Sequence, residues 1–163
     1  MSEEIGPQHH PCLPRELIAS TVFLLGRLGV AVKAQAFDEF EEAGFSPYHY
    51  SVLALLDEGA RETQATIAQA LGVDRSQLVG LLDRLEDRGL VERRRDPGDR
   101  RRHVVSLTPD GKRQLASFRS LAAQIEEDFL APLEPAARAA LHDLLLRIAT
   151  HRDVRFVADD AAA

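Results

Sequence analysis

The chain has 163 residues, of which 45% are hydrophobic and 28% are charged, and its formal net charge is −6. This length fits one domain, or one domain with a dimerising extension, and it allows a buried core. The single cysteine, Cys12, excludes an intramolecular disulfide. The N-terminus has neither the cationic n-region nor the apolar h-region of a signal peptide, and charged residues interrupt the longest apolar stretch. We therefore expect a cytoplasmic protein without a membrane span.

The charges are distributed unevenly along the chain. Nine arginines and seven acidic residues lie between Asp74 and His103, so this segment carries +2 and the rest of the chain −8. Phosphate attracts a basic segment and repels an acidic body, so this arrangement favours an oriented contact with nucleic acid.

Residues 1–12 are polar, contain two prolines and are predicted to form a loose arm. His9, His10 and Cys12 lie close together there, but two imidazoles and one thiol need further ligands to hold a metal. No metal and no cofactor are therefore expected. Residues 13–43 are predicted to form one long helix, because apolar residues recur at intervals of three and four. Its apolar face is wide, and a partner subunit is its natural cover.

Three shorter helices are predicted next. Ser46-Pro47 begins the first, which ends at Glu58, because serine is a favoured cap and proline a favoured first residue. Thr63 caps the second helix, Gln64–Leu71, and Asp74 caps the third, Arg75–Arg88, with a turn at Gly72 between them. Their predicted buried faces are Val52, Leu53, Leu55, Leu56, Ile67, Ala68, Leu71, Leu78, Leu81, Leu82 and Leu85.

Two short strands, Leu90–Arg95 and His103–Leu107, are predicted to form a hairpin, because Asp96-Pro97-Gly98-Asp99 between them has turn composition. A long helix from Thr108 to about Leu130 and a last one from Pro135 follow, and the tail 153–163 is expected to fray. The predicted fold class is mainly α with a small β-hairpin wing, a winged helix-turn-helix. Its DNA-binding domain would be residues 46–108, and residues 13–45 and 109–152 would form a dimerisation layer.

The start of the helix Arg75–Arg88 is predicted to enter the major groove of double-stranded DNA. Arg75 can bond phosphate or guanine, Ser76 can bond phosphate, Gln77 can pair with adenine, and the backbone can approach DNA at Gly80. Three acids on the same helix, Asp83, Glu86 and Asp87, would repel phosphate. We expect them to face away from DNA or to pair with Arg84 and Arg88.

The hairpin tip is the second predicted DNA contact. An arginine between two strands can enter a narrow minor groove, and Asp99 can hold the guanidinium of Arg101 in place. The other arginines of the hairpin are expected to bind phosphates: Arg93, Arg94, Arg95, Arg100 and Arg102.

The run LGVDRSQLVGLLDRLEDRGLVERRRDPGDRRRHVVSLTPDG resembles the multiple-antibiotic-resistance-regulator (MarR) family of bacterial transcription factors. The specific matches are LGVDRS, DRLEDRGLVER, DPGDRR and LTPDG, and the resemblance covers about residues 13–150. It implies a repressor-type homodimer with its recognition helix in the major groove. It also implies that Asp99 and Arg101 take the roles of the family's wing pair. The family usually has a larger polar or basic residue at the position of Gly80, so base readout shifts to Ser76 and Gln77.

The resemblance also implies release from DNA by a small phenolic or anionic effector that binds between the dimerisation layer and the DNA-binding domain. The residues expected to line such a cleft are Arg15, Tyr48, His49, Tyr50 and Arg113. The alternative is that the tyrosines pack in the core and Arg113 is a surface cation. A second alternative is redox sensing through Cys12, although the sequence around it does not match the family's peroxide sensors.

The leading interpretation is a homodimeric regulator on a pseudo-palindromic operator whose half-sites lie about 10 base pairs apart. The competing class is a winged helix that binds protein rather than DNA, and the arginine-rich wing argues against it. An enzyme is not expected, because the sequence has no phosphate loop, nucleophile elbow, metal-ligand spacing or paired-carboxylate pattern.

Overall fold

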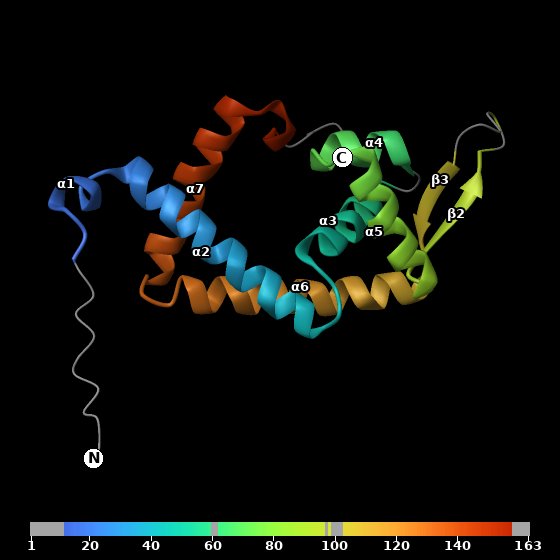
Figure 1. Cartoon of the computed structure of the whole chain (residues 1–163), viewed down its shortest axis with the longest axis horizontal. Coiled ribbons are helices and arrows are strands. Elements are labelled where there is room, and N and C mark those ends of the chain that lie inside the picture. Colours follow the sequence, from blue (N-terminus) through green and yellow to red (C-terminus); the bar gives the residue numbers. More distant parts are fainter. Residues whose placement is uncertain (1–11, 60–61, 97, 99–102, 158–163) are drawn as a thin grey trace, which may run out of the picture. The chain divides into compact units, whose positions relative to one another are not determined.

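The structure, a computed structural model, describes residues 12–59, 62–96, 98 and 103–157 (Figure 1). It is mainly helical with a small antiparallel sheet, which is the predicted fold class. The elements in chain order are α1 (Arg15–Ile18), α2 (Thr21–Glu42), α3 (Pro47–Glu58), β1 (Glu62–Thr63), α4 (Gln64–Leu71), α5 (Arg75–Asp87), β2 (Val91–Arg95), β3 (His103–Leu107), α6 (Pro109–Phe129), α7 (Pro135–Arg152) and the 3-10 helix η1 (Val154–Phe156). The chain divides into two compact units, residues 1–35 and 36–163.

The prediction of one continuous helix over residues 13–43 is wrong at Ala19 and Ser20, where α1 ends and α2 begins. The hydroxyl of Ser20 accepts a hydrogen bond from the backbone N–H of Phe23 at 3.3 Å. A serine that bonds the backbone three residues ahead starts a helix more readily than it continues one.

The core of the second unit is built from leucines and a group of aromatic rings. The four leucines predicted on α5 are all buried, whereas Leu55, Ala68 and Leu71 are only partly covered. Phe118 of α6 packs against Phe40 and Phe45, with ring centroids 5.3 and 4.9 Å apart. This core holds α3, α5 and α6 together.

The sheet has the strand order β1-β3-β2. In the hairpin, Val91 lies opposite Leu107 and Arg95 lies opposite His103. The third strand, β1, was not predicted, and it pairs with β3 through Thr63 opposite Val104. Two residues are too few for an alternating pattern to appear in the sequence.

A tight junction joins the end of α5 to the start of α6. Thr108 accepts a hydrogen bond from the N–H of Gly111 at 3.0 Å, and its own hydroxyl lies 2.7 Å from the carbonyl oxygen of Gly89. Gly111 packs directly on the Leu90 carbonyl, and a Cβ atom there would overlap that oxygen. Only glycine therefore fits at this position.

The C-terminal helix α7 is anchored at its start but has no buried residue. Arg138 donates from Nε to the carbonyl oxygen of Leu133 at 2.8 Å and pairs with Glu127 of α6. Residues 153–157, expected within a frayed tail, instead include η1, and residues 158–163 lie outside the described part of the chain.

Candidate nucleic-acid interface

The start of α5 presents an exposed polar surface. Asp74 caps the helix, and its Oδ1 atom accepts hydrogen bonds from the N–H of Gln77 at 2.8 Å and from the hydroxyl of Ser76 at 2.6 Å. Both bonds lower the pKa of Asp74, and the bond from Ser76 has the larger effect. Arg75, Ser76 and Gln77 are exposed. The cap thus fixes the backbone where the sequence predicts base contacts.

Gly80 lies one turn further along α5 and is exposed. Apart from its chain neighbours and the backbone of its own helix, no described atom lies within 4 Å of a Cβ built there. Packing therefore does not require a glycine at this position, and its effect is to leave open space on the exposed face of α5.

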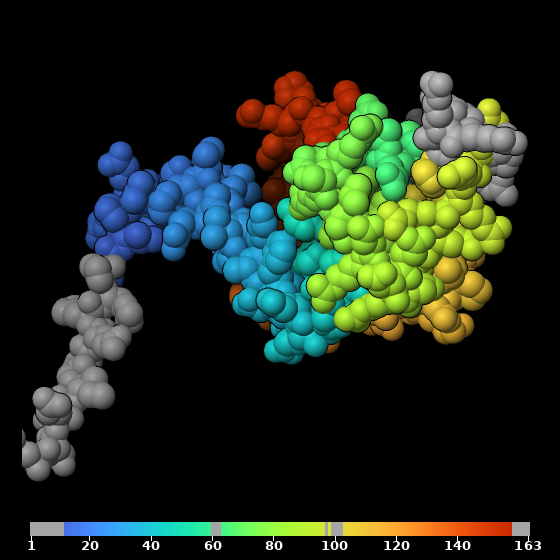
Figure 2. Space-filling model, turned by 45° about the vertical axis from the view of Figure 1, so that its right-hand side comes forward, coloured from blue at the N-terminus to red at the C-terminus, as the bar shows by residue number. Residues whose placement is uncertain are grey.

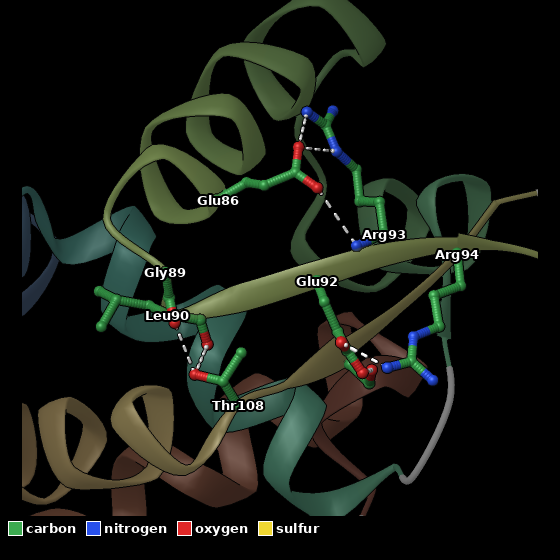
Figure 3. A network of polar contacts seen from close by, with 8 residues as sticks. Glu86, Gly89, Leu90, Glu92, Arg93, Arg94 and Thr108 are labelled. Atoms are coloured by element: carbon green, nitrogen blue, oxygen red, sulfur yellow. Dashed lines mark hydrogen bonds and ion pairs between the residues drawn. The ribbon is translucent and has the colours of Figure 1, made fainter.

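Arg93 of β2 links the wing to α5 (Figure 3). Its Nε atom lies 2.8 Å from Glu86 Oε2, and its Nη2 atom lies 2.6 Å from Asp83 Oδ1. Its backbone N–H donates to Glu86 Oε1 at 3.3 Å. The side chain is only 21% exposed. The hydrogen bond from Arg93 lowers the pKa of Glu86, so this acid remains ionised as a partner of the guanidinium.

The sequence predicts that the acids of α5 face away from DNA or pair with Arg84 and Arg88. The pairing is wrong for Asp83 and Glu86, which pair with Arg93, and the orientation away from DNA stays a prediction. Arg84 donates instead to the carbonyl oxygen of Gly44 at 2.8 Å. The guanidinium of Arg88 lies over the ring of Phe45, 4.4 Å from its centroid. The reason is helical position: residues 84 and 88 face the turn between α2 and α3, whereas 83 and 86 face the wing.

The other described arginines of the wing are exposed. Arg94 is 76% exposed and pairs with Glu92 at 2.9 Å, and Arg95 is also exposed. Figure 3 shows Arg93 and Arg94 on opposite sides of β2, as strand alternation requires. Figure 2 shows α5 and the wing strands adjoining on one face of the molecule. The predicted tip residues Asp99, Arg100, Arg101 and Arg102 lie outside the described residues.

The residues predicted to line an effector site differ in their surroundings. Tyr48 is half-buried, with its ring 5.7 Å from Phe37, and Tyr50 stacks on Phe40 at 6.0 Å. Arg113 pairs with Asp110 within α6 and is 74% exposed. Arg15 is exposed and belongs to the other compact unit.

His49 is a buried cap at the start of α3. It is 5% exposed, and its Nδ1 atom accepts a hydrogen bond from the backbone N–H of Ser46 at 3.0 Å. The neutral ring must therefore carry its proton on Nε2, and Nε2 has no hydrogen-bond partner among the described residues. Burial, followed by the charge of Arg84, lowers the pKa of His49 to about 4.

Cys12 is an exposed free thiol. Over the described ranges, no three His, Cys, Asp or Glu residues are grouped so that they could hold a metal ion. His9 and His10 are not among those residues. The described helices also include none that is both long and apolar enough to cross a bilayer.

A helix-turn-helix whose second helix is tied to an arginine-rich antiparallel hairpin defines the winged helix-turn-helix class. The family model described as the MarR family matches residues 43–102. A crystal structure of a MarR-family transcriptional regulator from Rhodococcus sp. RHA1 is 32% identical, with a TM-score of 0.69, over 78% of this chain and 91% of that one. The protein belongs to the MarR family.

Two named relatives are also similar. The transcriptional repressor NicR of Pseudomonas putida is 36% identical over 60% of this chain. The match spans 61% of that relative, less than two thirds of its length. The repressor CouR bound to a 23-mer DNA duplex is 34% identical over 86% of this chain and 99% of that one, with a TM-score of 0.75. CouR from Rhodococcus jostii RHA1 bound to p-coumaroyl-CoA is 32% identical over 83% of this chain and 96% of that one, with a TM-score of 0.67.

Replacing Arg93 with alanine is expected to lower the free energy of unfolding by about 1 kcal/mol, because partly buried hydrogen bonds between charged groups are lost. Arg94→Ala is the matched control on the exposed side of the same strand and should change stability by less than about 0.5 kcal/mol. Urea denaturation measures both. Carboxyl NMR should also show a higher pKa for Glu86 in Arg93→Ala. Equal stability losses with an unchanged Glu86 pKa would contradict the link between wing and helix.

His49 predicts a loss of stability in mild acid. Its pKa is about 4 in the folded protein and about 6.5 in the unfolded chain, so only the unfolded chain gains a proton as the pH falls below 6.5. His49→Gln keeps an acceptor for the Ser46 N–H but does not titrate. The stability of the wild type relative to this variant should fall by about 2 kcal/mol between pH 7.5 and pH 5. Parallel pH profiles in urea denaturation would show that His49 is not held neutral.

Proposed function

We propose that this protein is a cytoplasmic transcriptional repressor that binds a pseudo-palindromic DNA operator as a homodimer. The observation that carries the proposal is the ion-paired connection between α5 and the wing. It connects the exposed polar start of a recognition helix to a strand with exposed arginines, so the two can contact DNA together. The similarity to CouR bound to a DNA duplex supports the same assignment.

In this proposal, the recognition helix and the wing contact different parts of the DNA. Arg75, Ser76 and Gln77 read the major groove, and Gly80 lets the helix approach the base edges. Arg101, held by Asp99, enters the minor groove. The remaining wing arginines bind phosphates: Arg94, Arg95, Arg100 and Arg102. Arg93 has a positioning role, because its guanidinium is bonded to α5.

The exposed apolar faces of α2 and α7 support the homodimer. Val22 and Leu28 of α2 are 80% and 52% exposed, and Leu144 and Ile148 of α7 are 55% and 51% exposed. Apolar side chains exposed in such numbers on two helices are typical of a surface that a partner covers. A second copy is the occupant that also suits a two-fold operator, with half-sites about 10 base pairs apart.

The effector is proposed to be a small aromatic molecule with a carboxylate or phenolate group. The similarity to CouR bound to p-coumaroyl-CoA supports an aromatic ligand. On this chain, the Nε2–H of His49 is a buried donor without a partner among the described residues, and it suits an anionic oxygen. Tyr48 is half-buried and precedes His49 in the sequence, and Tyr50 and Arg113 complete the proposed set within this compact unit. Arg15 belongs to the other compact unit, and its part in effector binding stays a prediction from the sequence.

The DNA-binding proposal is tested with a duplex that the wild-type protein selects from a randomised pool. Arg101→Ala is expected to weaken binding roughly tenfold or more, because a minor-groove contact is lost. Gln77→Ala should instead change the selected consensus. Sedimentation should show two chains per duplex in the wild type, with circular dichroism as the folding control.

Each outcome of this experiment has a defined meaning. Affinity should fall steeply as salt rises, because bound phosphates release counterions. Unchanged affinity of Arg101→Ala would reject the wing assignment. The same consensus for Gln77→Ala would show that Gln77 does not read bases. Failure of the wild type to bind any duplex at low salt would favour the protein-binding alternative.

The effector proposal is tested by a thermal-shift screen with hydroxylated aromatic acids, repeated in the presence of the selected duplex. A true effector should raise the Tm of the free wild-type protein and release the DNA, because it stabilises the state that it binds. His49→Gln should weaken the response. Arg152→Ala is the control, because Arg152 is exposed at the end of α7 and is assigned neither to the effector nor to DNA. Running the screen with oxidant on the wild type and Cys12→Ser separates a thiol response from ligand binding. A response equal in wild type and His49→Gln would reject His49 as a ligand donor.

A further inference from the structure

The C-terminal end of the described chain lies against the turn of the helix-turn-helix. A Cβ atom built on Gly72 would lie 2.6 Å from Nη1 of Arg155. Figure 1 shows this end of the chain beside α4. Gly72 has a φ of +64° and ends α4, two residues before the Asp74 cap of α5. Arg155 therefore reaches the turn that sets the start of the recognition helix, from 83 residues further along the chain.

Asp153 holds Arg155 in this orientation. Its Oδ1 atom accepts a hydrogen bond from the backbone N–H of Arg155 at 3.0 Å, and its Oδ2 atom lies 2.9 Å from Nε and 2.5 Å from Nη2. These bonds from Arg155 lower the pKa of Asp153. Since Nε and Nη2 bond to Asp153, Nη1 is the nitrogen that extends towards Gly72.

The end of α4 lacks a cation of its own. Its last turn contains no basic residue, although the unpaired carbonyls at a helix C-terminus carry partial negative charge. Two backbone bonds close this end: Gly72 N–H donates to Gln69 O at 3.3 Å, and Val73 N–H donates to Ala68 O at 3.2 Å. A guanidinium beside Gly72 therefore supplies the favourable charge that this helix end lacks.

We propose that Arg155 is a positioning residue for DNA recognition, which holds the turn between α4 and α5 from the C-terminal end of α7. The proposal rests on the DNA-binding function proposed above. It connects α7, whose exposed apolar face we assign to the dimer, with the start of the recognition helix. Arg155 is a poor phosphate ligand in this arrangement, because Nε and Nη2 bond to Asp153 and Nη1 lies beside Gly72.

Amide hydrogen exchange of the DNA-free protein tests the contact directly. Arg155→Ala should speed exchange at Gly72 and Val73 by about two- to fivefold, because the charge–dipole interaction at the helix end is lost. Arg155→Lys should keep part of the protection, because the positive charge remains. Arg152→Ala removes a nearby cation at the end of α7 and is the matched control, with no change expected at either amide. Unchanged exchange in Arg155→Ala overturns the proposal.

Binding to the selected duplex over a salt series tests the functional consequence. Arg155→Ala should bind more weakly than Arg152→Ala, with the same dependence of log affinity on log salt as the wild type. A decrease of about one in that slope, with unchanged amide exchange, would show a direct phosphate contact and overturn a positioning role. If the wild type binds no duplex, the proposed function fails, and the exchange rates still decide whether Arg155 holds the turn.

Discussion

Arg93 resolves a conflict within the recognition helix. The helix α5 carries Asp83 and Glu86, which repel phosphate, on the same element that has to approach DNA. Arg93 binds both carboxylates from the neighbouring strand. Its positive charge balances one of the two negative charges, and its contacts connect the helix to the wing. Hydrogen bonds between charged groups fix direction as well as distance. The angle between α5 and β2 therefore depends on this interaction, and so does the relative position of the two surfaces that we assign to the major groove and the phosphates.

Contacts at two further places connect α5 to the rest of its compact unit. Beyond the end of α5, the hydroxyl of Thr108, the cap of α6, bonds to the Gly89 carbonyl, and Gly111 packs on the Leu90 carbonyl, where no side chain larger than hydrogen fits. On another face, Arg84 bonds the Gly44 carbonyl and Arg88 covers Phe45. The buried leucines hold α5 in the core, and these directional contacts determine its orientation.

The parts of the fold that could be predicted depend on residues close in sequence. A helix cap interacts with the backbone only three or four residues ahead. The structure has the predicted helices after each of the four caps, Ser46, Thr63, Asp74 and Thr108. The partners of Arg93, Glu86 and Asp83, lie seven and ten residues away across a turn. Composition alone predicts that Arg93 is another phosphate ligand. The spacing was nevertheless informative: once the leucines of α5 are assigned to the core, residues 83 and 86 must share a neighbouring face. Arg155 and Gly72 lie 83 residues apart in the sequence, so no local sequence pattern predicts their contact.

The position of His49 gives the proposed effector a physical route to the recognition helix. Burial and, after it, the charge of Arg84 lower the pKa of His49, so the two side chains interact electrostatically. Arg84 also fixes α5 to the turn before α3. An anion that accepts a hydrogen bond from Nε2–H of His49 would also attract the guanidinium of Arg84 and would compete for it with the Gly44 carbonyl. Such a ligand weakens DNA binding only if it prefers the arrangement of α5 that DNA does not, and by reciprocity DNA must then weaken the ligand to the same degree.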